Sequence, residues 1–157
     1  MQTKELLEPV KHIAQQAANR ILDVYGSEFE VEHKEDTSPL TQADLASHHA
    51  IVDGLAALTP DIPILSEDSA DIAFETRSAW QRYWLVDPLD GTKEFIKRNG
   101  EFTVNIALIE SGRPTLGVVW IPVTGRCYAG VVGDGATCQE ADGTEHPISV
   151  RTLGTQG

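Results

Sequence analysis

The sequence predicts an α+β fold in which two helices pack on a mainly antiparallel sheet. Two segments before residue 60 carry apolar residues at helical spacing. The rest of the chain carries short apolar runs, which are separated by brief turns rich in glycine and proline. Because short turns join antiparallel neighbours, we expect these runs to form a meander beneath one helical layer.

The first helix is expected over residues 4–25, where apolar residues recur every three or four positions, and Gly26 is expected to end it. The second helix is expected to begin with Thr41 as its N-cap and Asp44 in capping-box position, and to end before Pro60. Its apolar face is expected to contain Leu45, His49, Val52, Leu55 and Leu58.

The expected strands are apolar runs of three to six residues bounded by turn residues. A polar helix is expected over residues 72–82, and a short one over residues 93–97. The strand predictions cover residues 30–34, 62–65, 83–86, 104–109, 116–121, 127–132, 136–139 and 148–150.

Length and charge exclude several classes of protein. The 157 residues suit one domain with a sizeable core, because 41% of them are hydrophobic. The net charge of −12 disfavours a nucleic acid or an anionic membrane as the main partner. No apolar run approaches the roughly 18 residues of a membrane helix, and the first residues do not resemble a signal peptide. We therefore expect a soluble, cytoplasmic protein without a transmembrane segment, free or peripheral at the inner face of the cell membrane.

The two cysteines, Cys127 and Cys138, are too few for a disulfide framework. No CxxC pair or Cys/His cluster in the sequence indicates zinc. Both are expected to be buried thiols in strands. A cross-strand disulfide around the turn at residues 133–135 is the alternative, which a reducing compartment disfavours.

Acidic residues gather at the ends of three expected elements. Asp44 lies at a helix start, Glu67 and Asp68 follow one strand, and residues 87–92 follow the next. Each also has a purely structural interpretation: Asp44 as a residue that stabilises a helix N-terminus, Glu67 and Asp68 as solvated loop charges, and the last segment as a turn.

The segment at residues 87–92 combines features that indicate phosphoryl chemistry. Pro88 fixes φ and removes an amide donor, so Asp87, the Leu89 carbonyl and Asp90 can face one point. Such oxygen ligands suit Mg²⁺. The amides of Gly91 and Thr92, at the start of a short helix, would cradle a phosphate.

The run Trp84–Thr92, WLVDPLDGT, resembles the D-P-[IL]-D-G-T metal signature of the lithium-sensitive, Mg²⁺-dependent phosphatase superfamily that includes inositol monophosphatases. Residues 36–44 and 64–67 resemble further elements of this family in the same order. Residues 93–108 are more similar to the bacterial 3′(2′),5′-bisphosphate nucleotidase branch, because they lack the T-N-F and nearby His of the inositol enzymes. The similarity covers nearly all of residues 1–153.

The resemblance implies the N-terminal half of the inositol monophosphatase fold and hydrolysis with two or three Mg²⁺ ions, inhibited by Li⁺. It implies that Glu67, Asp87 and the Leu89 carbonyl hold the first ion, while Asp87 and Asp90 hold the second. Asp44 and Thr92 would be catalytic, activating the attacking water. The phosphate-binding set implied is Glu67, Leu89, Asp90, Gly91 and Thr92.

Other residues near these motifs keep structural interpretations or mark departures from the family pattern. Lys34 is expected at the surface, with a contact to the metal site as the alternative, and His48 and His49 are expected in packing or surface positions. Asp68 stands where the family usually has Glu, which leaves its supporting role open. The family's W-D-x-x-A-[AG] motif is not found, so we expect residues 1–157 to form an N-terminal phosphatase domain with most metal ligands, without the C-terminal domain.

The leading hypothesis is a 3′(2′),5′-bisphosphate nucleotidase, a phosphoric monoester hydrolase that the resemblance links to sulfate assimilation and to conversion of adenosine 3′,5′-bisphosphate into AMP and phosphate. Its partner would be a small nucleotide bisphosphate, and activity of these 157 residues alone stays open. One alternative is an inositol-phosphate or sugar-bisphosphate phosphatase. Another is a truncated, catalytically silent module that binds metal or associates with itself as a homo-oligomer through bared apolar surface.

Overall fold

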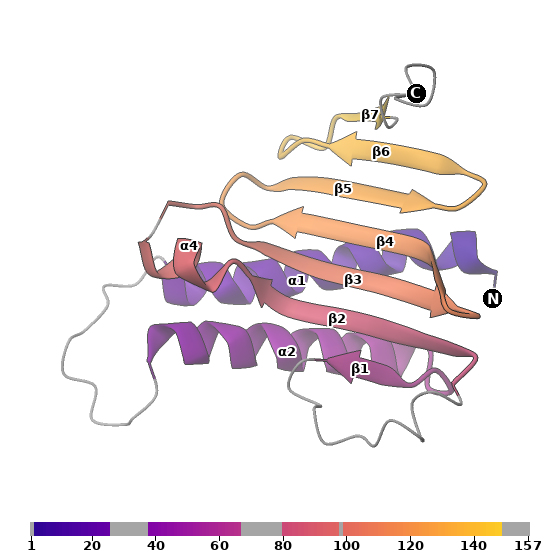
Figure 1. Cartoon of the computed structure of the whole chain (residues 1–157). Coiled ribbons are helices and arrows are strands. Elements are labelled where there is room, and N and C mark those ends of the chain that lie inside the picture. Colours follow the sequence, from indigo (N-terminus) through magenta and orange to yellow (C-terminus); the bar gives the residue numbers. More distant parts are fainter. Residues whose placement is uncertain (1, 26–37, 67–79, 98, 149–157) are drawn as a thin grey trace, which may run out of the picture.

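The computed structural model describes residues 2–25, 38–66, 80–97 and 99–148. Helices α1 and α2 lie side by side against one face of a sheet, and α4 lies beyond the end of β2 (Figure 1). The elements are η1 (Thr3–Leu6), α1 (Leu7–Tyr25), α2 (Pro39–Leu58), β1 (Ile64–Ser66), β2 (Arg82–Asp90), α4 (Thr92–Lys97), β3 (Thr103–Glu110), β4 (Arg113–Ile121), β5 (Arg126–Val131), β6 (Gly135–Gln139) and β7 (Glu145–Ile148).

The described strands form one seven-stranded sheet in chain order, from β1 to β7. β1 runs parallel to β2, and every following pair is antiparallel. From β3 to β7, short turns produce this order, because each turn places a strand antiparallel to the one before it. The predicted α+β fold with a mainly antiparallel sheet is confirmed.

The core lies between the helices and the sheet. Alternate residues of the strands, such as Trp84 and Ile106, are buried against the helices. From α1 the predicted apolar face is buried, with Val10, Ala14 and Ile21 fully enclosed. The helices approach closely where Gly54 has no side chain, since a Cβ there would lie only 2.9 Å from Ile13 Cγ1.

Two expectations for the second helix are wrong. Ser38, not Thr41, is the N-cap: its side chain accepts from the Thr41 amide at 3.1 Å, and Pro39 occupies the first turn. Asp44 therefore lies beyond the first turn, outside any capping box. The expected apolar face is only partly right: Leu55 is buried as expected, whereas Leu45 is 42% exposed. The buried residues are mostly small, which permits the close approach to α1: Ala43, Ser47, Ala50, Ile51 and Leu55.

The strand predictions are mostly confirmed, with shifted ends. Arg82 begins β2 instead of ending the predicted helix, because it pairs with Glu110 in the sheet and its Nε lies 2.6 Å from Glu110 Oε2. β7 begins at Glu145, three residues before the predicted 148–150, since the turn ahead of it closes early through a bond from the Glu140 amide to the Thr144 carbonyl. The strand at 30–34 and residues 72–79 of the predicted helix lie outside the described residues.

Cys127 and Cys138 are buried, as predicted, and both are free thiols. Cys127 lies opposite Gln139 in the register, and Cys138 lies opposite Tyr128. Residues at adjacent register positions point to opposite faces of a sheet. The alternative of a disulfide across this hairpin is therefore wrong.

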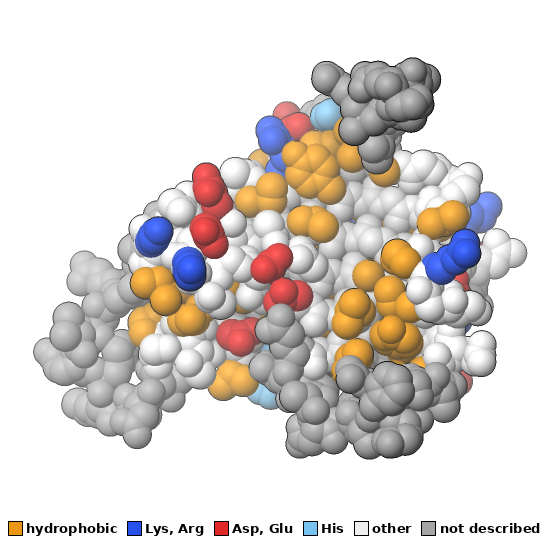
Figure 2. Space-filling view, viewed as in Figure 1, with side chains coloured by type: hydrophobic (Ala, Val, Ile, Leu, Met, Phe, Trp, Pro, Cys, Tyr) orange, Lys and Arg blue, Asp and Glu red, His pale blue; other side chains and the backbone are white. Residues whose placement is uncertain are grey.

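The second face of the sheet carries no helix among the described elements (Figure 1). Leu85 is 44% exposed on this face and Val119 37% exposed, and Figure 2 shows hydrophobic side chains gathered over it. Within the described ranges, no helix is both long enough and apolar enough to span a bilayer.

Candidate active site

The acidic segment lies at the carboxyl end of β2, where the strand is bulged. Asp87 pairs with Asn105 and Asp90 with Thr103, so two β2 residues lie opposite one residue of β3. The two bulged residues are Pro88 and Leu89. Proline is tolerated here because it has no backbone N–H that would need a partner in the sheet. The predicted turn is thus a bulged strand end. Asp87 is half-buried and Asp90 exposed, while the Leu89 side chain is buried.

A buried hydroxyl from α2 holds this bulge. Ser47 is fully buried and donates to the Pro88 carbonyl at 2.8 Å. One residue further along α2, His48 Nδ1 lies 3.2 Å from Ser66 Oγ at the end of β1. Helix α2 is therefore fastened to the ends of both parallel strands. His48 is half-buried and His49 is exposed, in line with the packing or surface positions expected for them.

The side-chain amide of Asn105 places one oxygen and one nitrogen beside the two carboxylates. Its Nδ2 donates to Asp90 Oδ2 at 3.2 Å, which fixes that carboxylate against β3. Within the described residues its Oδ1 is buried and accepts no hydrogen bond, and Asp87 Oδ1 is buried beside it in the register. Figure 2 shows acidic side chains gathered over the region where β2 ends and α4 begins.

Helix α4 begins directly after the carboxylates. Gly91 has φ +97°, a conformation that favours glycine, and its carbonyl accepts the first helical bond from the Phe95 amide at 3.0 Å. The amides of residues 92–94 precede that bond and have no acceptor within the helix. Phe95 anchors α4 by packing on Tyr25 and Phe102, with ring centroids 5.4 and 5.3 Å away.

The oxygen donors here fit a hard divalent cation. Two carboxylates and an amide oxygen converge on one strand end, and Mg²⁺ is usually held by a few such ligands together with water and phosphate oxygens. The buried Asn105 Oδ1 supports this fit, since an acceptor removed from water needs a donor or a cation.

A hollow of about 690 Å³ opens on the sheet face beside Asp87 and Asn105. Its floor is formed by small residues such as Ala107 and Gly117, and its walls by Leu85 and Val119. This volume is within the range of small-molecule sites.

The structure brings together most of the predicted site residues, though their roles stay predictions. Asp87, Leu89, Asp90, Gly91 and Thr92 follow one another from the bulge into α4. Asp44 lies on α2, which contacts both β2 and α4. Lys34, Glu67 and Asp68 lie outside the described residues.

Sequence reasoning missed Ser47 and Asn105. Asn105 is a polar residue between Val104 and Ile106 in a strand, a pattern that fits any half-exposed strand position. Ser47 resembles an ordinary small helix residue. Only the pairing of β2 with β3 and the packing of α2 on β2 bring these side chains to the site.

The inositol monophosphatase family pattern matches residues 2–155 of this chain. The chain belongs to the inositol monophosphatase family. Its resemblance to this family and the fold that the resemblance implies are thereby confirmed.

Among curated relatives of this family member, the 3′(2′),5′-bisphosphate nucleotidase CysQ of Salmonella typhimurium is 53% identical over 148 residues. The protein of that name from Escherichia coli K12 is 51% identical. Each match covers 93% of this chain and 59% of the relative, so the chain spans less than two thirds of their length.

Solved structures agree with the fold. The crystal structure of CysQ from Bacteroides thetaiotaomicron, described as a bacterial member of the inositol monophosphatase family, superposes with a TM-score of 0.81 at 39% identity, covering 98% of this chain and 55% of that one. An inositol monophosphatase from Zymomonas mobilis superposes with a TM-score of 0.76 at 28% identity, covering 97% and 55%.

Proposed function

We propose that this chain carries the metal- and phosphate-binding part of a 3′(2′),5′-bisphosphate nucleotidase, which hydrolyses adenosine 3′,5′-bisphosphate to AMP and phosphate in sulfate assimilation. The observation that carries the proposal is the bulged end of β2, where Asp87, Asp90 and Asn105 present oxygen donors beside the start of α4. The curated relatives named bisphosphate nucleotidases support the choice of substrate over inositol phosphates and sugar bisphosphates.

In this proposal Asp87, the Leu89 carbonyl and Asp90 hold Mg²⁺ together with Glu67, and the complete site takes two or three ions. Bound Mg²⁺ would neutralise the carboxylates, attract the phosphate and stabilise the attacking and leaving oxygens. Li⁺ is expected to inhibit. Asn105 keeps the Asp90 carboxylate in place through its 3.2 Å hydrogen bond.

Asp44 and the Thr92 hydroxyl are proposed to orient the attacking water and to take up its proton. Helix α2 can hold Asp44 steady, because Ser47, one turn later, is bonded to the bulge itself. The phosphate is proposed to contact the amides of Gly91 and Thr92. Glu67, Leu89 and Asp90 complete the proposed phosphate-binding set. No covalent intermediate is needed, since water is the nucleophile.

The organisation and location of the protein also belong to the proposal. We propose that residues 1–157 form the N-terminal phosphatase domain, with most of the metal ligands on β2. The cytoplasm is the proposed location, and peripheral association with the inner membrane face stays a prediction.

The test is phosphate release from adenosine 3′,5′-bisphosphate with and without Mg²⁺, for the unmodified chain, Asp87→Asn and the control Asp53→Asn. Asp53 is exposed on α2, so the control substitution removes one negative charge at a position away from the bulge. We expect Mg²⁺-dependent release that Li⁺ inhibits and that Asp87→Asn lowers at least about 100-fold. Faster release from inositol phosphates or sugar bisphosphates would favour the second phosphatase class.

Metal binding without release from any of these substrates would overturn hydrolysis by this chain and favour the third class, a silent or self-associating module. The open sheet face with exposed Leu85 and Val119 is the observation that favours this class. Light scattering at high concentration tests the self-association of this class, since a strictly monomeric chain counts against it.

A further inference from the structure

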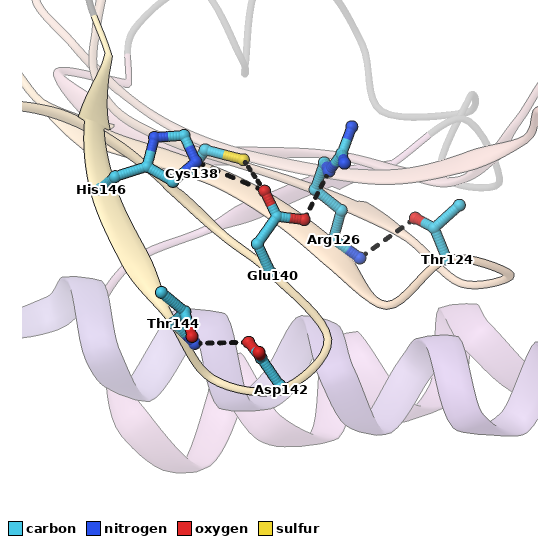
Figure 3. Close-up of polar contacts among 7 residues, drawn as sticks. All are labelled: Thr124, Arg126, Cys138, Glu140, Asp142, Thr144 and His146. Atoms are coloured by element: carbon cyan, nitrogen blue, oxygen red, sulfur yellow. Dashed lines mark hydrogen bonds and ion pairs between the residues drawn. The ribbon is translucent and has the colours of Figure 1, made fainter.

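A second group of metal-ligand side chains lies near the far edge of the sheet. Cys138 on β6, Glu140 directly after β6 and His146 on β7 each offer one ligand atom, and these three atoms lie within 4.8 Å of one another. Figure 3 shows the Cys138 thiol and the His146 ring directed at the same carboxylate oxygen. The proposed hydrolysis uses none of them.

The hairpin between β6 and β7 creates this arrangement. Cys138 and His146 are directly paired across the two strands, so their side chains share one face. The turn that joins the strands is closed by the Glu140 amide, which donates to the Thr144 carbonyl at 2.8 Å. The backbone therefore brings all three residues together, although eight positions separate Cys138 from His146 in the sequence.

Two of the three separations between the ligand atoms match those of a tetrahedral zinc site. Glu140 Oε2 lies 3.6 Å from Cys138 Sγ and 3.3 Å from His146 Nε2. A tetrahedral zinc ion with bonds of about 2.3 Å to sulfur and 2.0 Å to nitrogen and oxygen separates such pairs by about 3.5 and 3.3 Å. The carboxylate oxygen thus already has the separations that coordination would require.

The carboxylate is also oriented as a ligand. Its other oxygen, Oε1, accepts from Arg126 Nε at 3.0 Å, which leaves Oε2 directed at the thiol and the imidazole. The Arg126 guanidinium and then the His146 ring lower the pKa of Glu140. Burial and the Glu140 carboxylate raise the pKa of Cys138, so a metal would displace the thiol proton when it binds.

We propose that Cys138, Glu140 and His146 bind one zinc ion that fastens the edge strand β7 to β6, with water as the fourth ligand. A thiolate, an imidazole and a carboxylate suit zinc, whereas Mg²⁺ prefers oxygen alone. The site is separate from the β2 site. Four strand spacings lie between β2 and β6, about 19 Å.

The test uses Co²⁺, whose thiolate complexes give a near-ultraviolet charge-transfer band that carboxylate complexes lack, followed by competition with Zn²⁺. Two variants remove one ligand each, Cys138→Ala and His146→Asn. Each has a matched control: Cys127→Ala removes the thiol on the opposite face, and His12→Asn removes an exposed imidazole on α1. His146 is exposed at the sheet edge, so its variant is expected to fold.

We expect one Co²⁺ per chain with a thiolate band, displaced by Zn²⁺. Cys138→Ala should abolish the band, and His146→Asn should weaken Co²⁺ binding at least about tenfold. Both controls should keep the band and the affinity of the unmodified chain. Excess Zn²⁺ should raise Tm by about 5 °C more in the unmodified chain and the controls than in the two ligand variants. Absence of the band, or a band that survives in Cys138→Ala, would overturn the proposal. In that case the contacts are only a hydrogen-bonded ion pair with Arg126.

Discussion

At the scale of single residues, Gly91 does two things that another residue cannot. Its φ of +97° turns the chain from β2 into α4, and a Cβ there would lie 3.2 Å from the Phe102 Cα and from Glu94 Oε1. A larger residue at position 91 would therefore have two costs. One is backbone strain at the positive φ, and the other is a steric contact with the Phe102 backbone, which cannot move freely.

Substituting Gly91→Ala separates these effects when compared with Gly112→Ala. Gly112 has φ +80° with nothing within 4 Å of a Cβ, so it reports the strain alone, about 1 kcal/mol. We expect Gly91→Ala to cost at least about 1 kcal/mol more in urea unfolding and to lower Mg²⁺-dependent phosphate release more than Gly112→Ala does. Equal costs and equal release would show that the Gly91 turn is an ordinary surface turn.

Residue type and order were sufficient to single out Asp87 and Asp90 as candidate ligands, but not to predict the residues that hold them in place. Asp87, Asp90 and Gly91 stand in one short motif, and their chemistry is visible from residue type and order alone. Asn105 and Ser47 are distant in the chain and chemically ordinary. Their roles come from strand register and helix packing, which local patterns do not encode.

At the scale of elements, a polar cluster around Glu110 joins the start of β2, the end of β3 and the start of β4. Its carboxylate contacts Arg82 Nε at 2.6 Å and accepts from Thr115 Oγ1 at 2.7 Å. The Thr115 hydroxyl and, after it, Arg82 lower the pKa of Glu110. Because the folded pKa is lowered, this group stabilises the fold above its unfolded pKa, and the contribution is lost as pH falls through the folded pKa.

Glu110→Gln is therefore expected to destabilise the chain by about 1 kcal/mol at neutral pH, with a difference that shrinks below about pH 4. Urea unfolding of both proteins between pH 2.5 and 7 measures it, with Glu101→Gln as an exposed carboxylate that corrects for net charge. A difference that stays constant over this range would contradict the assigned ionic role.

Helix ends and faces were the least predictable features of the elements. Thr41 and Asp44 satisfy the spacing of a capping box, yet Ser38 followed by Pro39 starts the helix one turn earlier. The apolar face of α2 was partly misplaced because its buried residues are mostly small, and close packing with α1 selects small residues over larger apolar ones. Most strands were predicted well, since alternation and short turns act locally.

At the scale of the whole molecule, the two faces of the sheet differ. One face is covered by α1 and α2, and the other exposes Leu85 and Val119 among the described elements (Figures 1 and 2). The antiparallel order of β3 to β6 was predictable from short turns, whereas the parallel pairing of β1 with β2 was not. The sequence led us to expect bared apolar surface in a self-associating module, but it did not specify that the exposed face of β2 and β4 forms that surface.

We expect this face to cause self-association at high concentration, and Leu85→Lys to reduce it. Leu45→Lys is the matched control, because Leu45 is 42% exposed against 44% for Leu85 but lies in the helical layer. Light scattering should give masses above 17.1 kDa for the unmodified chain and the control, and lower masses for Leu85→Lys. Equal masses for the two variants would place any association elsewhere.

The central claim is that the bulged end of β2 holds divalent cations. Mn²⁺ is a paramagnetic substitute for Mg²⁺, and its free fraction can be measured directly during a titration of the chain. We expect Asp87→Asn to weaken Mn²⁺ binding at least about tenfold while Asp53→Asn binds as the unmodified chain does. Equal Mn²⁺ affinity in Asp87→Asn and the unmodified chain would contradict the claim.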